Sequence, residues 1–288
     1  MLNITFFQSW NFYISGLLRI IIFYSMTRII LKFSFDALTW GLSFFMLLNI
    51  ALLSQVSAQN ILIYTHNGEG NGDPYIHKNI PHAVKALVKM ANEQGWQYQE
   101  SDDPGFFTTE NVRDLDCVIF ANTNNEAFDT EEQKEVFANY IRNGGGFVGI
   151  HSASGSEREW PWYWAMLGGK FLRHPPLQEF KIKVIDPDHP ATDFLGGTWD
   201  WEDEPYYLNN LNPDIHILLA LDYTQLKDKD DAQGPGLQFG SYTPLSWCHT
   251  FDGGRQFYTA LGHKKEYYKD EKFLKHILGG IQWVLNKE

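Results

Sequence analysis

Four histidines of this 288-residue sequence follow short apolar segments, a position from which an imidazole could bind a metal ion or transfer a proton. These histidines are His66, His77, His151 and His263. If the apolar segments are parallel strands, their carboxyl ends share the edge at which open α/β sheets bind ligands. We therefore expect a site at that edge of the sheet.

The first interpretation of this site is a divalent metal centre. Neutral imidazole and carboxylate are the usual ligands of zinc and similar ions, and an open coordination position would let the metal polarise a carbonyl or activate water. The expected ligands are His77, His151, His263 and Glu204. These residues lack the local spacing of a metal motif, so a second interpretation stays open, in which His151, His263 and Glu204 act as general acid and base without a metal.

Aromatic residues gather in the second half of the sequence and suit a carbohydrate cleft. We expect Trp160 and Tyr206 to contact a sugar, because aromatic rings stack on the apolar faces of sugar rings while acidic neighbours accept hydrogen bonds from hydroxyl groups. Arg255 could clamp a polar group of the substrate. The alternatives are core packing for the two aromatic residues and an ion pair at a hairpin turn for Arg255.

The segment that must position His151 has the pattern of a helix end followed by a strand. Three glycines at 144–146 follow an amphipathic helix that ends near Arg142, and glycine takes the positive φ angles of a helix C-terminus without steric cost. Residues 147–150 form an apolar run with the length of a central parallel strand. His151 is therefore expected at the carboxyl end of that strand.

Strand and helix patterns alternate through the first half of the chain after residue 58. Strands are expected at 61–64, 96–100 and 117–120, and helices over 80–94 and from Asp129. This order predicts an α/β fold with a doubly wound, mostly parallel sheet and helices on both faces. No linker divides the segment, so we expect a single domain.

The pattern changes after His151. We expect a short aromatic helix from Trp160, an acidic aromatic loop over 199–207, and a final hairpin whose turn contains Asp252-Gly253-Gly254, because such residues tolerate positive φ angles. The strands expected in this half are 181–185, 215–221, 244–250 and 256–261. The last helix is expected at 272–286.

Residues 1–58 differ from the rest of the chain and have the features of a leader. Counting from Met26, a short basic region precedes an apolar core over 37–53 and small residues up to Ala58, the pattern of a signal peptide cleaved after Ala58. We expect an exported protein, periplasmic or extracellular, with its domain at 59–288. The residues before Met26 would then come from a start codon assigned too far upstream. An uncleaved membrane anchor is the alternative, although the core is shorter than the ~20 apolar residues of a spanning helix.

The acidic charge of the expected domain argues against nucleic acid as a partner. Of the 23 basic and 35 acidic side chains, three and one lie in residues 1–58, so residues 59–288 have a formal charge of −14. Binding to phosphates needs clustered Lys and Arg, and the local basic groupings of this sequence are short. A small-molecule carbohydrate is the expected partner, with a membrane only if the leader is uncleaved.

Several motifs occur in an order that is specific to one family. They are GGGFVGIHSASGSEREWPWY at 144–163, His174-Pro175, Asp188-His189-Pro190, Asp203-Glu204-Pro205-Tyr206, and SWCHTFDGGRQFYTALGHKKEYY at 246–268. Through them residues 59–288 resemble ThuA-like (trehalose utilisation) proteins. The resemblance implies a flavodoxin-like fold related to class I glutamine amidotransferases, in bacterial proteins associated with the metabolism of trehalose and keto-sugar derivatives.

The sequence departs from the amidotransferases at the turn after the strand 147–150. Those enzymes have a nucleophilic cysteine at this turn, whereas here His151 takes its place, and neither Cys117 nor Cys248 lies at such a turn. Both cysteines lie in apolar strand patterns, so we expect buried thiols without a disulfide. We therefore expect an exported, metal-assisted enzyme of sugar or keto-glycoside metabolism without glutaminase activity, or alternatively a non-catalytic carbohydrate-binding protein.

Overall fold

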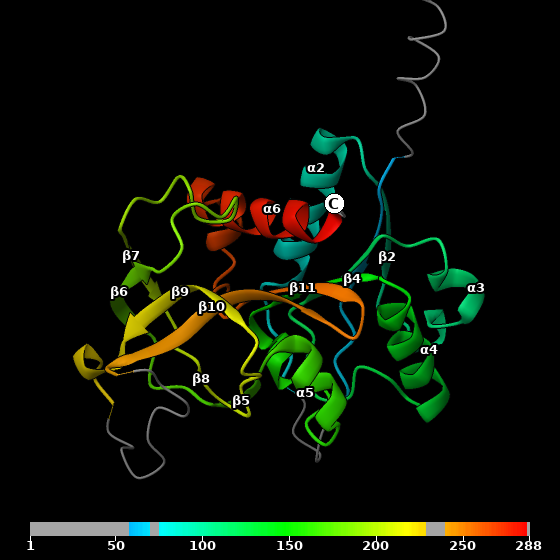
Figure 1. The fold of residues 1–288 in the computed structure, drawn as a ribbon, viewed down its shortest axis with the longest axis horizontal. Helices are drawn as coiled ribbons and strands as arrows, with labels where there is room; N and C mark the ends of the chain where they lie inside the picture. Colours follow the sequence, from blue (N-terminus) through cyan, green and yellow to red (C-terminus); the bar gives the residue numbers. More distant parts are fainter. Residues whose placement is uncertain (1–57, 70–74, 229–239, 287–288) are drawn as a thin grey trace, which may run out of the picture. The chain divides into compact units, whose positions relative to one another are not determined.

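Apolar strands and amphipathic helices alternate along the chain and build a nine-stranded sheet with helices on both faces (Figure 1). The computed structural model describes residues 58–69, 75–228 and 240–286. The strands lie in the order β2-β1-β3-β4-β11-β10-β9-β6-β7. In that order their bounds are Gln97–Ser101, Asn60–Tyr64, Cys117–Ala121, Gly146–Ile150, Gly254–Thr259, Tyr242–Phe251, His216–Asp222, Gln178–Val184 and Thr198–Asp203.

The first five strands in this order are parallel to one another, and the remaining pairs are antiparallel. The helices of the described residues are α2 (Ile80–Gln94), α3 (Thr109–Val112), α4 (Glu131–Arg142), α5 (Pro161–Leu167) and α6 (Glu271–Leu285). Strand and helix alternate from β1 to β4, which confirms the predicted flavodoxin-like, doubly wound α/β fold.

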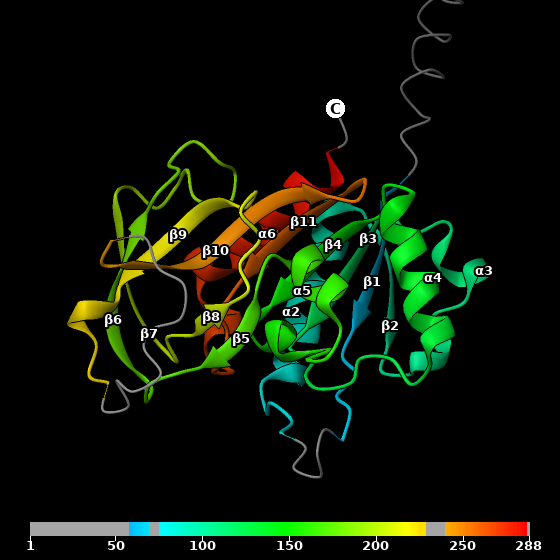
Figure 2. The same ribbon diagram turned by 60° about the horizontal axis from the view of Figure 1, so that its bottom comes forward.

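Strand β4 is covered on both faces, by different helices (Figures 1 and 2). Phe147 packs against Phe137 of α4 and Tyr163 of α5, with ring centroids 5.8 and 6.3 Å apart. Gly146 faces the opposite side, where a Cβ atom would collide with Val284 of α6. Because α6 approaches the sheet this closely, only glycine fits at position 146.

The predicted C-terminal hairpin is present and joins β10 to β11. Asp252 and Gly253 in its turn have φ angles of 52° and 97°, as a tight connection between antiparallel strands requires. Strand β11 also pairs in parallel with β4, where Thr259 lies opposite Ile150. The carboxyl ends of β4 and β11 therefore coincide, and an expected site histidine follows each of them.

The segment 199–207, expected to be a loop, contains a strand of the main sheet. Trp199, Trp201 and Asp203 of β7 are buried, whereas the alternate residues Asp200 and Glu202 are exposed. This period of two is the signature of a strand with one covered face. The loop prediction was wrong because the acidic residues form the exposed face of an edge strand and do not mark a break in secondary structure.

A small two-stranded sheet was not expected from the sequence. Strand β5 (Lys170–Arg173) pairs antiparallel with β8 (Tyr207–Asn209), and the main sheet does not include either strand. His174 directly follows β5, and Tyr206 directly precedes β8. This small sheet therefore determines where these two side chains lie.

Some predictions fall outside the described part of the chain. The expected leader and its cleavage position lie in residues 1–58, of which the structure describes only Ala58. Among the described residues, none of the helices combines the length and the apolar character needed to cross a membrane. Cys117 and Cys248 are both buried, as predicted.

One buried histidine links the last helix to the rest of the domain. The His276 ring on α6 lies 2.9 Å from the Ala191 carbonyl through Nδ1 and 3.1 Å from Thr259 Oγ1 through Nε2. Because a carbonyl oxygen only accepts, Nδ1 donates to Ala191. Burial lowers the pKa of His276 to about 4, so this side chain is neutral in the folded protein at neutral pH.

We predict that His276 makes the domain less stable in acid. Its pKa is lower in the folded state than in the unfolded state, so the neutral ring favours folding above the unfolded pKa, and this contribution is lost as the pH falls toward the folded value. The variant His276→Gln should weaken the acid dependence of the free energy of unfolding between pH 6.5 and 4.5 by on the order of 1–3 kcal/mol. Urea titrations at both pH values measure it, and an unchanged dependence would contradict the assignment.

Candidate metal centre

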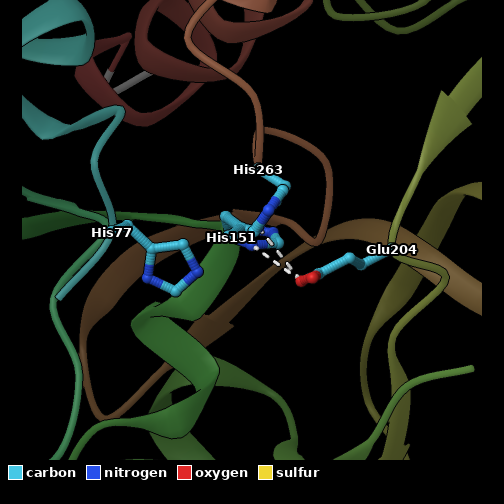
Figure 3. Close-up of side chains that lie close together, drawn as sticks. All are labelled: His77, His151, Glu204 and His263. Atoms are coloured by element: carbon cyan, nitrogen blue, oxygen red, sulfur yellow. Dashed lines mark ion pairs between the residues drawn. The ribbon is translucent and has the colours of Figure 1, made fainter. Parts of the chain in front are cut away.

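Three histidines and one glutamate from four separate segments converge at the carboxyl edge of the parallel strands (Figure 3). They are the four expected ligands His77, His151, Glu204 and His263. Each offers one ligand atom, and these atoms all lie within 4.8 Å of one another. The structure therefore brings together a group that could hold one metal ion.

His151 lies at a sharp turn directly after β4 and is fully buried. Its φ angle of 50° is in the left-handed region, which residues other than glycine rarely adopt. Nδ1 lies 2.7 Å from the carbonyl oxygen of Ala260, which can only accept, so Nδ1 carries the hydrogen. Nε2 therefore carries no hydrogen, and it lies 3.7 Å from Glu204 Oε2. This orientation by a backbone carbonyl is typical of histidine ligands.

His77 precedes α2 and lies against the other two imidazoles. Its ring centroid is 4.8 Å from that of His151 and 5.4 Å from that of His263. Both ring nitrogens of His77 are buried and have no hydrogen-bond partner in the described part of the chain. Burial, followed by the neighbouring His263, lowers the pKa of His77 to about 4. A neutral imidazole without partners fits a metal ligand better than a structural residue, because buried polar atoms are normally hydrogen-bonded.

Glu204 supplies the negative charge of the group. Its Oε2 lies 3.1 Å from His263 Nδ1, and Figure 3 shows this carboxylate pointing toward His263 and His151. Burial opposes ionisation of Glu204, but the neighbouring histidines outweigh burial and lower the pKa of its carboxyl. In return, Glu204 raises the pKa of His263. The carboxylate is thus held ionised among imidazoles, which favours binding of a cation.

Asp203 holds the Glu204 segment against the end of β11. Its buried carboxylate accepts hydrogen bonds from the backbone N–H groups of Gly262 and Glu204, both at 2.9 Å, and from Trp201 Nε1 at 3.1 Å. Burial raises the pKa of Asp203 to about 6. Through these bonds Glu204 is placed beside His263, the residue that follows Gly262.

Asn79 connects the His77 segment to the same place. Its Nδ2 lies 2.5 Å from the carbonyl oxygen of Gly262, 2.8 Å from that of His263 and 3.0 Å from Asn122 Oδ1. Asn79 directly precedes α2, so these bonds hold the segment that contains His77 close to His263. Asp203 and Asn79 were not expected to contribute to the site.

A cavity of about 320 Å³ opens beside the four-residue group and includes His77, Glu204 and Tyr206 in its wall. The Tyr206 hydroxyl lies 2.9 Å from His151 Nε2 and, since that nitrogen carries no hydrogen, donates to it. The volume is at the lower end of the range for small-molecule pockets. Tyr206 therefore lies where the expected substrate contact requires.

The other two expected substrate contacts do not reach this cavity. Trp160 packs on Phe128 and Trp162 in the aromatic core, with ring centroids 6.1 and 5.1 Å apart. Arg255 lies near the beginning of β11, whereas His263 follows the other end of this strand, and its guanidinium lies 3.9 Å over the Trp283 ring of α6. We therefore assign neither Trp160 nor Arg255 to the pocket.

Seven further residues of the pocket wall were not among the expected site residues. They are Tyr75, Asn124, Ser152, Gly155, Arg158, Phe171 and His174. A signal existed for Asn124, because it lies just beyond the carboxyl end of a predicted strand, and for Ser152 and Arg158, which belong to the motif that contains His151. Phe171 and His174 depend on the unexpected sheet of β5 and β8. The His174-Pro175 motif marked His174 in the sequence, but only this sheet places it in the pocket wall.

Comparisons with known proteins agree with this architecture. A protein-family model described as trehalose utilisation, ThuA, matches residues 60–284. A comparison with curated proteins finds no match. Similar solved structures include a protein described as ThuA-like from Bacteroides uniformis, which is 23% identical with a TM-score of 0.65, over 82% of this chain and 94% of that one.

A second solved structure, described as ThuA-like and from Parabacteroides merdae, is 19% identical with a TM-score of 0.60, over 80% of this chain and 91% of that one. At these identities the likeness shows a shared fold. The family match is broader evidence, because it spans more than half of the sequence and includes all four residues of the candidate metal centre. This chain therefore belongs to the ThuA (trehalose utilisation) family.

Proposed function

We propose that this ThuA-family protein is a metal-assisted enzyme that acts on a sugar or keto-glycoside. The observation that carries the proposal is the His77 ring, whose two buried nitrogens have no hydrogen-bond partner among the described residues and lie beside three other ligand atoms. An unsatisfied buried polar group costs about 1–3 kcal/mol. Coordination by His77, His151, His263 and Glu204 would remove that cost for the one ring nitrogen of His77 that binds the ion. The adjoining cavity has room for one sugar ring.

Zinc is the ion that we propose for this group. Three imidazoles and one carboxylate are donors that suit zinc, whereas calcium and magnesium prefer oxygen ligands. When bound, such an ion supplies a Lewis acid that polarises a carbonyl group or lowers the pKa of water.

The remaining chemistry belongs to Glu204 and Tyr206, which line the pocket beside the group. Ala260 keeps the Nδ1 hydrogen of His151 in place, so Nε2 is the atom of this ring that would bind the ion. The Tyr206 hydroxyl, which donates to Nε2 in this structure, could then donate to a sugar oxygen instead. Groups of this kind transfer protons in hydrolysis, isomerisation and elimination at a keto-sugar alike.

The proposal does not include glutaminase activity. At the turn after β4, where the amidotransferases have their cysteine nucleophile, this chain has His151. Cys117 lies within β3, and Cys248 lies within β10, where burial raises the pKa of its thiol to about 12. A thiol with such a pKa is a poor nucleophile at neutral pH.

We predict that His77→Ala and His151→Ala each lower zinc affinity. The loss should exceed the about 10- to 100-fold that removal of an outer-sphere partner costs, because a direct ligand is removed. Mass spectrometry after dialysis against a chelator, together with calorimetric titration, measures bound zinc. His66→Ala is the matched control, since His66 lies in the same β1–α2 connection but bonds the Asp102 carbonyl. Full zinc content in both ligand variants would exclude the metal centre.

Turnover of a keto-glycoside by the zinc-loaded protein is the second expected outcome. A panel of keto-glycosides and their parent sugars, followed by NMR, should reveal a product that the Glu204→Gln variant forms about 10²- to 10⁴-fold more slowly, the usual contribution of an acid–base group. Binding without any product would instead identify a non-catalytic carbohydrate-binding protein.

We also propose export to the periplasm or the medium, which the small residues before Gln59 support. The mature protein is then expected to begin at Gln59. N-terminal sequencing of the protein from the periplasmic and secreted fractions measures this directly. An intact leader recovered with the membrane fraction would show a membrane-anchored form.

A further inference from the structure

Arg158 is a cation in the pocket wall that has no carboxylate partner among the described residues. Three other arginines of the described residues do have one: Arg113 pairs with Asp114, Arg142 with Glu135, and Arg173 with Asp228. Arg255 has none among these residues either, but it lies over the Trp283 ring, away from the pocket. A guanidinium on the wall of a small pocket, with no anion beside it in the described part of the chain, is a natural binding group for an anionic part of the substrate.

Two hydrogen bonds fix the guanidinium in place. Arg158 Nε donates to the carbonyl oxygen of Gly155 at 3.1 Å, and Nη2 donates to Asn124 Oδ1 at 3.3 Å. A Cβ atom at position 155 would lie 2.6 Å from Asn124 Oδ1 and 3.2 Å from Arg158 Nη2. Glycine at this position therefore leaves the space in which the arginine and the amide meet.

The segment that carries Arg158 is itself held by the buried residue Glu157. The Glu157 carboxylate accepts hydrogen bonds from the backbone N–H groups of Ala127 and Phe128, at 2.8 and 3.1 Å. Its backbone N–H donates to the Asn125 carbonyl at 2.8 Å. Because its support is rigid, Arg158 loses little freedom when a ligand binds, which favours affinity.

A row of side chains connects Arg158 to the metal centre. Its guanidinium carbon lies 5.7 Å from the centroid of the Phe171 ring. Phe171 contacts Tyr206, with centroids 4.5 Å apart, and Tyr206 contacts His151, with centroids 4.4 Å apart. One wall of the cavity therefore runs from a fixed cation, over two aromatic rings, to the candidate ligands.

We propose that the substrate of this pocket is a single sugar ring that carries a carboxylate, such as a uronic acid, and that Arg158 binds that carboxylate. The proposal rests on the proposed function and names its substrate class. The planar guanidinium matches a carboxylate in two parallel hydrogen bonds. The cavity of about 320 Å³ accommodates one ring, which lies along Phe171 with its opposite side toward Glu204 and the histidines. The carboxylate thus sets which carbon of the ring faces the metal centre.

The test compares matched sugars on the zinc-loaded protein by calorimetric titration. D-glucuronate and D-galacturonate should bind at least about 10-fold more tightly than D-glucose and D-galactose, since a hydrogen-bonded charge pair is worth about 10- to 100-fold in affinity. This preference should disappear in Arg158→Gln, persist in part in Arg158→Lys, and remain complete in Arg113→Gln, the surface control. Melting temperatures of all variants verify their folding.

Three outcomes would overturn the proposal: no detectable binding of either uronate, equal binding of uronates and neutral sugars, or a uronate preference that survives in Arg158→Gln. Glucose 6-sulfate bound as tightly as glucuronate would overturn the carboxylate assignment. Zinc content, measured in parallel, shows whether a negative result concerns the uronate proposal or the proposed metal-assisted enzyme. Arg158→Gln should keep its zinc, whereas a protein that binds uronates through Arg158 but no zinc would contradict only the metal-assisted enzyme.

Discussion

The parallel pairing of β4 with β11 is the constraint on which the rest of the site depends. It places the ends of two strands that are over a hundred residues apart in the sequence at the same point, so that the carbonyl of Ala260 can accept from His151. This bond selects the tautomer of His151 and directs Nε2 toward Glu204. Without that register, the turn after β4 would present an imidazole of undefined orientation.

Buried polar groups then complete the assembly from outside the ligand set. Asp203 accepts hydrogen bonds from the backbone of Glu204, which follows β7, and of Gly262, which follows β11. Asn79, at the start of α2, bonds the carbonyl of the same Gly262. Each is buried and each satisfies backbone groups that would otherwise be costly. His77 differs from them, because both of its ring nitrogens lack a hydrogen-bond partner in the part of the chain described, which favours the group as a candidate metal centre.

The pocket combines this centre with features of different origin. The turn after β4 is shared with the amidotransferase-like fold, but this chain has an imidazole there in place of the cysteine, and an imidazole suits the proposed metal chemistry. The antiparallel half of the sheet adds Glu204, and the small sheet of β5 and β8 adds an aromatic wall. The candidate site of this α/β fold therefore depends on the antiparallel strands and the small sheet that are added to the parallel part. Such additions can change the function while the fold stays the same.

The sequence by itself determined the alternation of strands and helices from β1 to β4, the C-terminal hairpin, and the four residues that converge, because strand carboxyl ends and hairpin turns have local patterns. It also identified the family. Only the tertiary structure decided that 199–207 is largely strand, that Trp160 and Arg255 lie away from the pocket, and that Arg158 lines it. The physical reason is that these placements depend on pairing between distant segments, such as β6 with β7 and β5 with β8, and a residue's own neighbours in the chain do not encode which distant strand it will meet.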